Sequence, residues 1–257
     1  MREFLGLDGY QRPAEGYFSW QHLTFVTGLI VIMTILAVFL GRRDRRNPAH
    51  NNQVLKWAAI LIDGLEIFKI VIFSIRGNDP WAFLHNLPLF LCSIQLITIP
   101  LAAFSTGRLR EAALDFVCIF GLLGAVLGTY FAGNNYGTYP VMSVDNVVSG
   151  LTHCISGFCS LYILISGMGS MAKRDLPFTF GILGFFCVAA YVANIIDDCN
   201  YMFLSRGDGT PYDILFNLVG GHPVVYPVSV VALFVIYILA YYQIHWLCTR
   251  KKQTVAN

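Results

Sequence analysis

Charged residues are scarce in this chain. Only 12% of its 257 residues are Asp, Glu, Lys or Arg, whereas soluble domains carry about 25%. The hydrophobic share is 56% and the mean hydropathy is +0.61. Apolar runs long enough to cross a bilayer recur along the whole chain, which leaves no room for a soluble domain. We therefore expect an integral membrane protein that does not bind nucleic acid.

Several other signals are missing. The start, "MREFLGLDGYQRPAEGYFSWQ", has acidic residues and a proline where a secretory signal peptide needs an apolar core. The seven cysteines include no CxxC pair and fall in or beside apolar runs, so most are expected to pack as small hydrophobic residues. No internal repeat and no low-complexity tract appears, which argues against an inverted-repeat transporter.

Seven apolar segments meet the requirement of about 20 residues for crossing the hydrocarbon core. The loops between them carry turn or charge signals such as "RRDRRNPAHNN", "STGRLRE" and "AGNNYGTYP". The expected helices span 22–41, 54–75, 83–104, 112–132, 147–168, 178–204 and 225–248. The fold class is therefore all-α, a bundle of about seven transmembrane helices.

Basic residues are unevenly distributed between the two sets of loops. The first, third and fifth loops and the C-terminal tail contain Arg42, Arg43, Arg45, Arg46, Arg108, Arg110, Lys173, Arg174, Arg250, Lys251 and Lys252. The opposite side contains only Arg2, Arg12, Arg76 and Arg206. The positive-inside rule then predicts an outer N-terminus and a cytoplasmic C-terminus.

Ionisable groups on four expected helices fall at similar depth. At 1.5 Å per residue they lie roughly 9 to 13 Å below the outer edge. These groups are Glu66, Lys69, Cys92, His153, Asp197 and Asp198. Intramembrane charges normally face the bundle interior or a water-filled cavity. One polar cavity that opens outward is the expectation.

The third expected helix contains "HNLPLFLCSIQL". Cys92 and Gln95 share a face of this helix, and His85 lies two turns above Cys92 on the same stripe. Pro88 removes a backbone hydrogen bond and is expected to kink the helix. We expect this stripe to face the cavity, with Asn86 at its outer end.

Structural roles are equally compatible with most of these residues. Glu66 and Lys69 are spaced to neutralise one another, and Cys92 or His153 can serve packing or helix–helix hydrogen bonding. Asp197, Asp198 and Asn200 can cap the end of the sixth helix. Small residues in the fourth helix are expected to serve close packing only: Gly121, Gly124, Ala125 and Gly128.

The favoured chemistry is thiol-dependent acyl transfer or hydrolysis on a lipid. A histidine can take the proton of a thiol, and His153 matches Cys92 in depth. Asp198 or Glu66 would orient that base, and Gln95 would assist as a donor to an oxyanion. The cavity would be lined further by His85, Asn86, Lys69, Asp197, Asn200 and His222.

Three other chemistries are weighed against this one. The ionisable residues of the cavity could relay ions or bind a small molecule in a transporter. His85, His153 and His222 could form a zinc centre of a lipid hydrolase, although no HxxxH or HExxH spacing is present. The seventh helix has no lysine to hold retinal, which argues against a light-driven protein.

The residues also carry a family resemblance. "LPLFLC", a histidine early in the fifth span, Glu66 and "NYMFLSRGDG…YDILFNLVGGHPVVYP" resemble the YwaF-like family of bacterial membrane proteins over essentially the whole chain. That family reads LPL-His-Leu-Cys where this chain has Phe90. It is similar to the animal transmembrane protein 164 group of proposed cysteine-dependent acyltransferases. The resemblance implies Cys92 as the acyl-accepting nucleophile and His153 as the base.

We therefore predict one polytopic domain over 1–257. Residues 1–21 form an interfacial lead-in, 22–248 the bundle and 249–257 a basic cytoplasmic tail. We favour an enzyme over a transporter. The enzyme would be a lipid acyltransferase of a bacterial plasma membrane, and it would need no metal or other cofactor. Its expected partners are membrane lipids, including an acyl donor, with no obligate protein partner.

Overall fold

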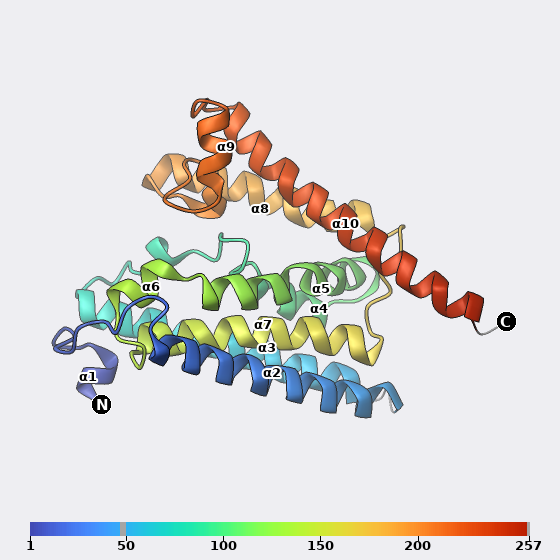
Figure 1. Ribbon diagram of the computed structural model, residues 1–257, viewed down its shortest axis with the longest axis horizontal. Coiled ribbons are helices and arrows are strands. Elements are labelled where there is room, and N and C mark those ends of the chain that lie inside the picture. The colour runs from blue at the N-terminus through green and yellow to red at the C-terminus, as the bar shows by residue number, and fades with distance from the viewer. Residues whose placement is uncertain (47–49, 256–257) are drawn as a thin grey trace. The chain divides into compact units, whose positions relative to one another are not determined.

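The protein is helical throughout the part that the computed structural model describes, residues 1–46 and 50–255, and no β-strand forms there (Figure 1). The predicted all-α fold class is confirmed for these residues. The helices are α1 (Arg2–Leu5), α2 (Trp20–Arg46), α3 (Asn51–Gly77), α4 (Gln95–Phe104), α5 (Gly107–Tyr130), α6 (Gly133–Thr138), α7 (Val144–Ser166), α8 (Leu176–Asp197), α9 (Tyr212–Leu218) and α10 (Val225–Val255). Two 3-10 turns, η2 (Leu84–Asn86) and η3 (Tyr201–Phe203), complete the described elements.

Five helical segments are long and apolar enough to cross a membrane. They are α2, α5 together with α6 (Gly107–Thr138), α7, α8 and α10 (Val225–Thr249). The helix α3 is also 27 residues long. It falls outside this group because Asp63, Glu66 and Lys69 interrupt its apolar run.

The third expected helix, 83–104, is not continuous, so that prediction was wrong. Leu87 has an extended backbone (φ −64°, ψ 143°), as the residue before a proline prefers. Proline at position 88 therefore ends the short η2 turn, and regular α-helix resumes only at Gln95. The ten residues of α4 extend about 15 Å, half of the hydrocarbon thickness.

Two other boundaries differ from expectation. The helix α8 ends at Asp197 rather than at residue 204, because Asp198 takes a left-handed conformation (φ 48°). The helix α10 continues past residue 248 to Val255. The side chains of 250–257 lie outside the described part. The predicted basic tail, 249–257, falls almost entirely on these residues.

The chain divides into two compact units. The first unit contains Met1–Pro88 and Gln95–Gly169, and the second contains Leu89–Ile94 and Ser170–Asn257. The short segment Leu89–Ile94 thus leaves the first unit, packs with the second, and returns. The predicted single domain over 1–257, with its lead-in 1–21, stays a prediction.

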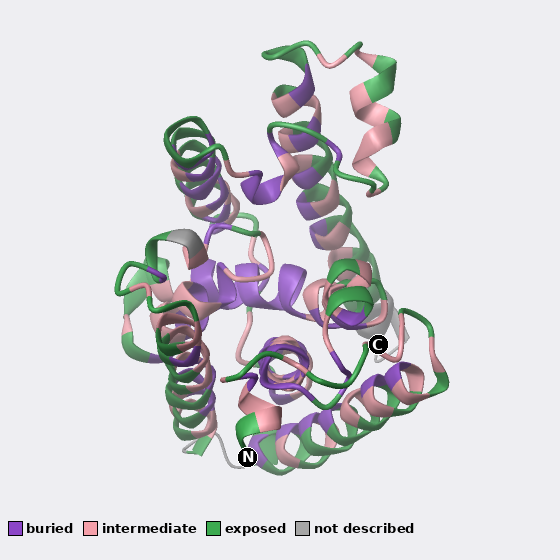
Figure 2. Ribbon diagram, turned by 90° about the vertical axis from the view of Figure 1, so that its left-hand side faces the viewer, coloured by how far each residue is buried: buried purple, intermediate pink, exposed green. Residues whose placement is uncertain are grey.

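The first unit is built around α5 and α7. The helix α5 packs against α4 and α7, and α7 also packs against α2 and α3. Within the most apolar stretch of α5–α6, 67% of the residues are buried, against 17% in α2. Buried residues accordingly gather on the inner faces of the long helices, whereas the outer faces are exposed (Figure 2).

Small residues let α5 and α7 approach closely. A Cβ atom on Gly121 would lie 2.5 Å from the carbonyl oxygen of Ser156, and one on Gly157 would lie 2.5 Å from the Cβ of Ala125. Such distances do not occur between non-bonded atoms, so only glycine fits at either position. This is the close packing expected for Gly121 and Ala125.

The second unit consists of α8, η3, α9, α10 and the segment Leu89–Ile94. The side chain of Asn194 in α8 holds η3 by two hydrogen bonds to the backbone of Tyr201, of 2.6 and 3.0 Å. The hydroxyls of Thr179 and Tyr242 lie 3.2 Å apart and join α8 to α10.

Candidate functional site

Cys92 lies on the segment Leu89–Ile94, which packs with the second unit. Its neighbour Phe90 contacts Tyr201 edge to face, with ring centroids 5.1 Å apart, and Phe203 at 6.0 Å. Phe203 in turn stacks on Tyr212 at 5.1 Å. Two sequence motifs separated by more than 100 residues, "LPLFLC" and "NYMFL…YDILF", therefore meet in one aromatic cluster.

One phenol of this cluster, that of Tyr212, lies near Cys92, and a further phenol, that of Tyr226, belongs to the same unit. Burial raises the pKa of Tyr212, and a thiolate at nearby Cys92 raises it further. Tyr212 therefore stays protonated and can donate a hydrogen bond. The hydroxyl of Tyr226, a residue packed on Phe216, is buried with no hydrogen-bond partner in the described residues. A buried donor of this kind is rare and is consistent with a site that a ligand completes.

Cys92 differs from most other cysteines of the chain. Four thiols, those of Cys118, Cys154, Cys159 and Cys187, are buried within helices, as expected for packing residues. Cys92 is half-buried and lies outside regular α-helix. No disulfide forms among the described residues. Partial exposure is what a thiol needs to meet a substrate.

His153 is placed in the first unit, on α7, with its ring against Gly128 of α5. A Cβ atom on Gly128 would lie 2.1 Å from Nε2 of His153, so glycine is required there. The Nδ1 atom lies 2.7 Å from the carbonyl oxygen of Ser149. A carbonyl only accepts, so Nδ1 carries the proton in the neutral ring and Nε2 is the acceptor nitrogen. That is the tautomer that a base requires.

The orientation of His153 differs from the expected one. Asp198 or Glu66 was predicted to hold the ring, but the hydrogen bond at Nδ1 goes to the backbone of Ser149 instead. Both carboxylates have other partners, Arg206 and Lys69. Because Cys92 and His153 belong to different units, their pairing stays a prediction.

Gln95 opens α4 three residues after Cys92. Its side chain is fully buried, and its Oε1 accepts a hydrogen bond of 3.2 Å from the Thr98 hydroxyl. Its Nε2 has no hydrogen-bond partner in the part of the chain that the structure describes. The amide is therefore an available donor, as the predicted assisting role requires, although that role itself stays a prediction.

Glu66 and Lys69 form an ion pair on α3. The Lys69 Nζ lies 2.7 Å from Oε1 of Glu66, and both side chains are mostly buried. The two charges neutralise one another, which is the structural arrangement that their spacing allowed. Asp63 lies one turn earlier on the same helix and is also half-buried. The sequence prediction missed this third ionisable residue, although its spacing of three from Glu66 was visible.

The polar residues after α8 stabilise a loop. Asn200 is buried, and its Oδ1 accepts from the backbone N–H groups of Ser205 and Arg206, while its Nδ2 donates to Asp208 and to the Arg206 carbonyl. Asp197 is exposed. Asp198 is fully exposed and lies 3.8 Å from Arg206. These contacts are those of a helix end and its loop, and they leave the predicted cavity roles untested.

The remaining candidates lie in turns. Asn86 in η2 donates to the carbonyl of Ala82 at 2.8 Å. The Nδ1 of His222 accepts from Val224 and Val225 at the start of α10, at 3.3 Å each. The side chain of His85 lies outside the described residues. Among the side chains that are described, no three His, Cys, Asp or Glu residues lie close enough to hold a metal ion.

His22 is a second buried histidine that the sequence did not single out. Its Nδ1 accepts from the N–H of Phe18 at 3.2 Å, and its Nε2 donates to the carbonyl of Thr129 at 3.0 Å. Its ring stacks on Tyr136 with centroids 3.8 Å apart. Both nitrogens serve the backbone, so His22 joins α2 to the end of α5 and is not a candidate base. In the sequence, nothing about the residues around His22 distinguished it from His153.

Comparison with known proteins gives one match. The model of the TMEM164 family matches residues 17–242. No curated protein and no solved structure matches the chain. The predicted relation to the transmembrane protein 164 group is confirmed, whereas the assignment to the YwaF-like bacterial family stays a prediction.

Proposed function

The chain belongs to the TMEM164 family, and from that premise we propose that it is a multi-pass protein of the cell membrane that transfers acyl chains between lipids through a thioester on Cys92. We place the N-terminus outside and the C-terminus in the cytoplasm. Seven crossings then require α3 and the segment 84–104 to enter the membrane beside the five apolar spans. Non-helical backbone such as Leu87–Ile94 is tolerated at that depth where protein surrounds it.

The observation that carries this proposal is the position of Cys92. It is a half-buried thiol on a non-helical segment, beside a protonated Tyr212, where the two sequence motifs meet in the aromatic cluster. The hydroxyl of Tyr226, in the same unit, is buried and has no hydrogen-bond partner in the described residues. Phenol donors can stabilise a thiolate and the oxyanion that forms when it attacks an ester.

The reaction proceeds in two balanced steps. The thiolate of Cys92 attacks the ester carbonyl of a donor lipid, so that a C–S bond forms and the ester C–O bond breaks. The leaving alkoxide takes a proton from the base, which had received the thiol proton, and departs as a lysolipid. The hydroxyl of an acceptor lipid then attacks the thioester, which releases the acylated product and restores the thiol. Water in place of the acceptor would make the reaction a hydrolysis.

His153 is our candidate for the base, since its neutral tautomer presents Nε2 as the acceptor. Gln95 is our candidate for an additional oxyanion donor through its unpartnered Nε2. Asp198 and Glu66 have other partners, and we assign them no step.

The test is an acyl-transfer assay with the purified full-length protein in detergent–lipid micelles. A diacyl phospholipid with a labelled chain serves as donor and a lysophospholipid as acceptor, and product is followed by mass spectrometry. Cys92→Ser is expected to lower the rate by about 1000-fold or more. Cys199→Ser is the matched control, because Cys199 is also half-buried in the second unit. A Cys92→Ser protein as active as the control would contradict the proposal.

That contradiction would favour the second candidate function, ion transport. The observation behind it is the row Asp63, Glu66 and Lys69 on α3, in which three half-buried ionisable groups follow one another by single turns. Such rows occur in proton and ion relays.

A further inference from the structure

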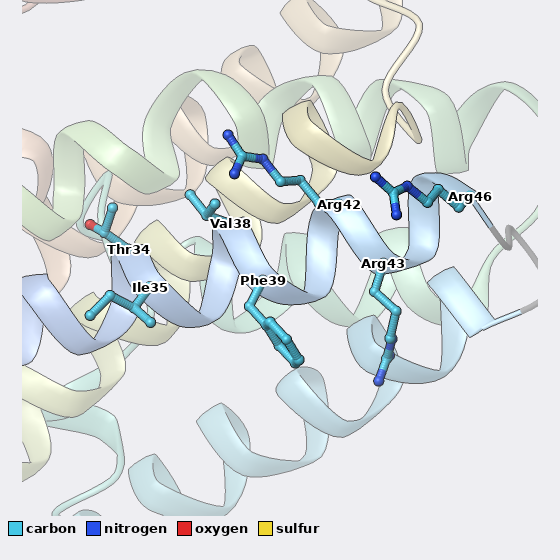
Figure 3. A pocket seen from close by; sticks show the side chains of 7 residues that line it. All are labelled: Thr34, Ile35, Val38, Phe39, Arg42, Arg43 and Arg46. Carbon is cyan, nitrogen blue, oxygen red and sulfur yellow. The ribbon is translucent and has the colours of Figure 1, made fainter.

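A groove of about 660 Å³ runs along one face of α2 (Figure 3). Its lining has two rows at helical spacing of four residues. One row is Thr34, Val38, Arg42 and Arg46, and the other is Ile35, Phe39 and Arg43. The groove is open on its outer side, and its lining residues all belong to α2.

The groove has an apolar end and a cationic end. Residues 34 to 39 lie in the apolar run of a membrane-spanning helix, and only Thr34 among the lining residues there carries a hydroxyl, which bonds to the Ile30 carbonyl. Three arginine side chains follow within the next two turns, as Figure 3 shows. The distance along the axis from Thr34 to Arg46 is about 18 Å. An elongated ligand with one apolar and one anionic part matches this polarity.

The three arginines are not equivalent. Arg43 is held by Asp44, with Nε to Oδ1 at 2.6 Å and Nη2 to Oδ2 at 3.1 Å. Asp44 is itself buried and accepts from the Tyr162 hydroxyl at 2.6 Å. Arg42 and Arg46 lie on the other row, are exposed, and form no ion pair within the described residues. Two guanidinium groups one turn apart thus remain available to an anion, and their planar forks suit phosphate.

We propose that this groove binds one anionic phospholipid. The phosphate and acidic headgroup lie between Arg42 and Arg46, and an acyl chain lies along Ile35, Val38 and Phe39. Basic grooves at the end of a membrane helix recognise anionic lipids in this way. This site belongs to the first unit and is independent of the acyl transfer proposed at Cys92.

The experiment is native mass spectrometry of the full-length protein in detergent, with phosphatidylglycerol and phosphatidylcholine of identical chains in competition. The wild type is expected to retain phosphatidylglycerol in preference, and Arg42→Gln with Arg46→Gln is expected to lower that retention by about tenfold. Arg45→Gln is the control, since Arg45 is also exposed on the same helix but does not line the groove. Equal losses in the control would mean attraction to charge in general and would overturn the proposal.

A Val38→Trp variant and a competition with inorganic phosphate test the two parts of the proposed ligand separately. Val38→Trp fills the apolar part and leaves all the arginines, so it is expected to lower lipid retention with no loss of the arginine charge. Inorganic phosphate at millimolar concentration is expected not to displace the lipid. Retention unaffected by Val38→Trp, displacement by phosphate alone, or equal retention of both lipids would each overturn the assignment to a phospholipid. If the double variant does not fold, Val38→Trp and the two-lipid competition on the wild type carry the test.

Discussion

In the first unit, the backbones of α5 and α7 are in contact. In the second unit, aromatic rings pack between the elements, and hydrogen bonds hold the loop after α8. Gly121 and Gly157 mark the close approach of α5 and α7. Phe90, Tyr201, Phe203 and Tyr212 form the connected rings of the other unit.

This difference separates two tasks. Close helix packing leaves little freedom, which suits a scaffold that holds His153 against Gly128. The aromatic cluster instead packs on a non-helical segment, and the same unit contains an unpartnered phenol, Tyr226. Reactive groups are commonly placed on irregular segments that a rigid scaffold supports.

The largest effect on stability is expected from Gly121→Val in the first unit. A Cβ at this position meets the carbonyl oxygen of Ser156 at 2.5 Å, so α5 and α7 must separate. We expect a loss of about 3 kcal/mol, at the upper end of the usual cost of overpacking. Thermal unfolding in detergent measures it. Gly28→Val on α2 is the control, because nothing lies within 4 Å of a Cβ at that position. Equal melting temperatures for the two variants would remove the contrast between the units.

A smaller effect is expected from Asn200→Ala in the second unit. The substitution leaves the backbone N–H groups of Ser205 and Arg206 without their acceptor. The expected loss is about 2 kcal/mol, and the loop between η3 and α9 should become accessible to protease. The exposed Asp197→Ala, at the last residue of α8, is expected to change neither result. A protease-resistant Asn200→Ala protein would show that the rings alone hold this unit.

The smallest effect concerns the N-terminal segment, in which the Tyr10 hydroxyl donates a hydrogen bond to Asp145 of α7. Burial, and then a hydrogen bond to Asp145, raise the pKa of Tyr10 to about 12. Arg76 completes the cluster, 2.8 Å from Asp145. The pKa of an unfolded tyrosine is about 10, so the stabilisation from Tyr10 is full below pH 10 and is lost as the pH rises through 12.

The measurement is the melting temperature of wild type and Tyr10→Phe from pH 8 to 12. The wild type should lose its advantage over Tyr10→Phe across the upper two units of this range. A constant difference over the whole range would contradict the role of the phenol proton.

The helical fold class and the membrane location could be predicted because both depend on the length of the apolar runs, which is visible in the sequence. The third span could not be placed correctly, since apolar residues continue past Pro88 although the backbone at Leu87 does not. The spacing of Glu66 and Lys69 did predict their pairing, because three residues bring two side chains to one face of a helix.

The candidate site was only partly accessible to sequence reasoning. Cys92 was identified from its polar surroundings, but Tyr212 was not, because its proximity to Cys92 depends on the tertiary packing of Leu89–Ile94 with η3 and the residues that follow. Asp198 was paired with His153 because the two residues have similar membrane depths when ideal helices are assumed. The depth of Asp198 was measured on a helix expected to reach residue 204, whereas α8 ends at Asp197, so the role of Asp198 stays a prediction.

The most direct test of the central claim is the reactivity of Cys92 toward a lipid-like thiol reagent, followed by peptide mass spectrometry of the full-length protein. Wild type is compared with His153→Ala, with Tyr212→Phe and with His22→Ala as a histidine that serves only structure. We predict fast and selective modification of Cys92 that slows about tenfold or more in the first two variants and not in the third. Slow modification in all proteins, or labelling spread evenly over Cys92, Cys199 and Cys248, would show that Cys92 is not an activated nucleophile.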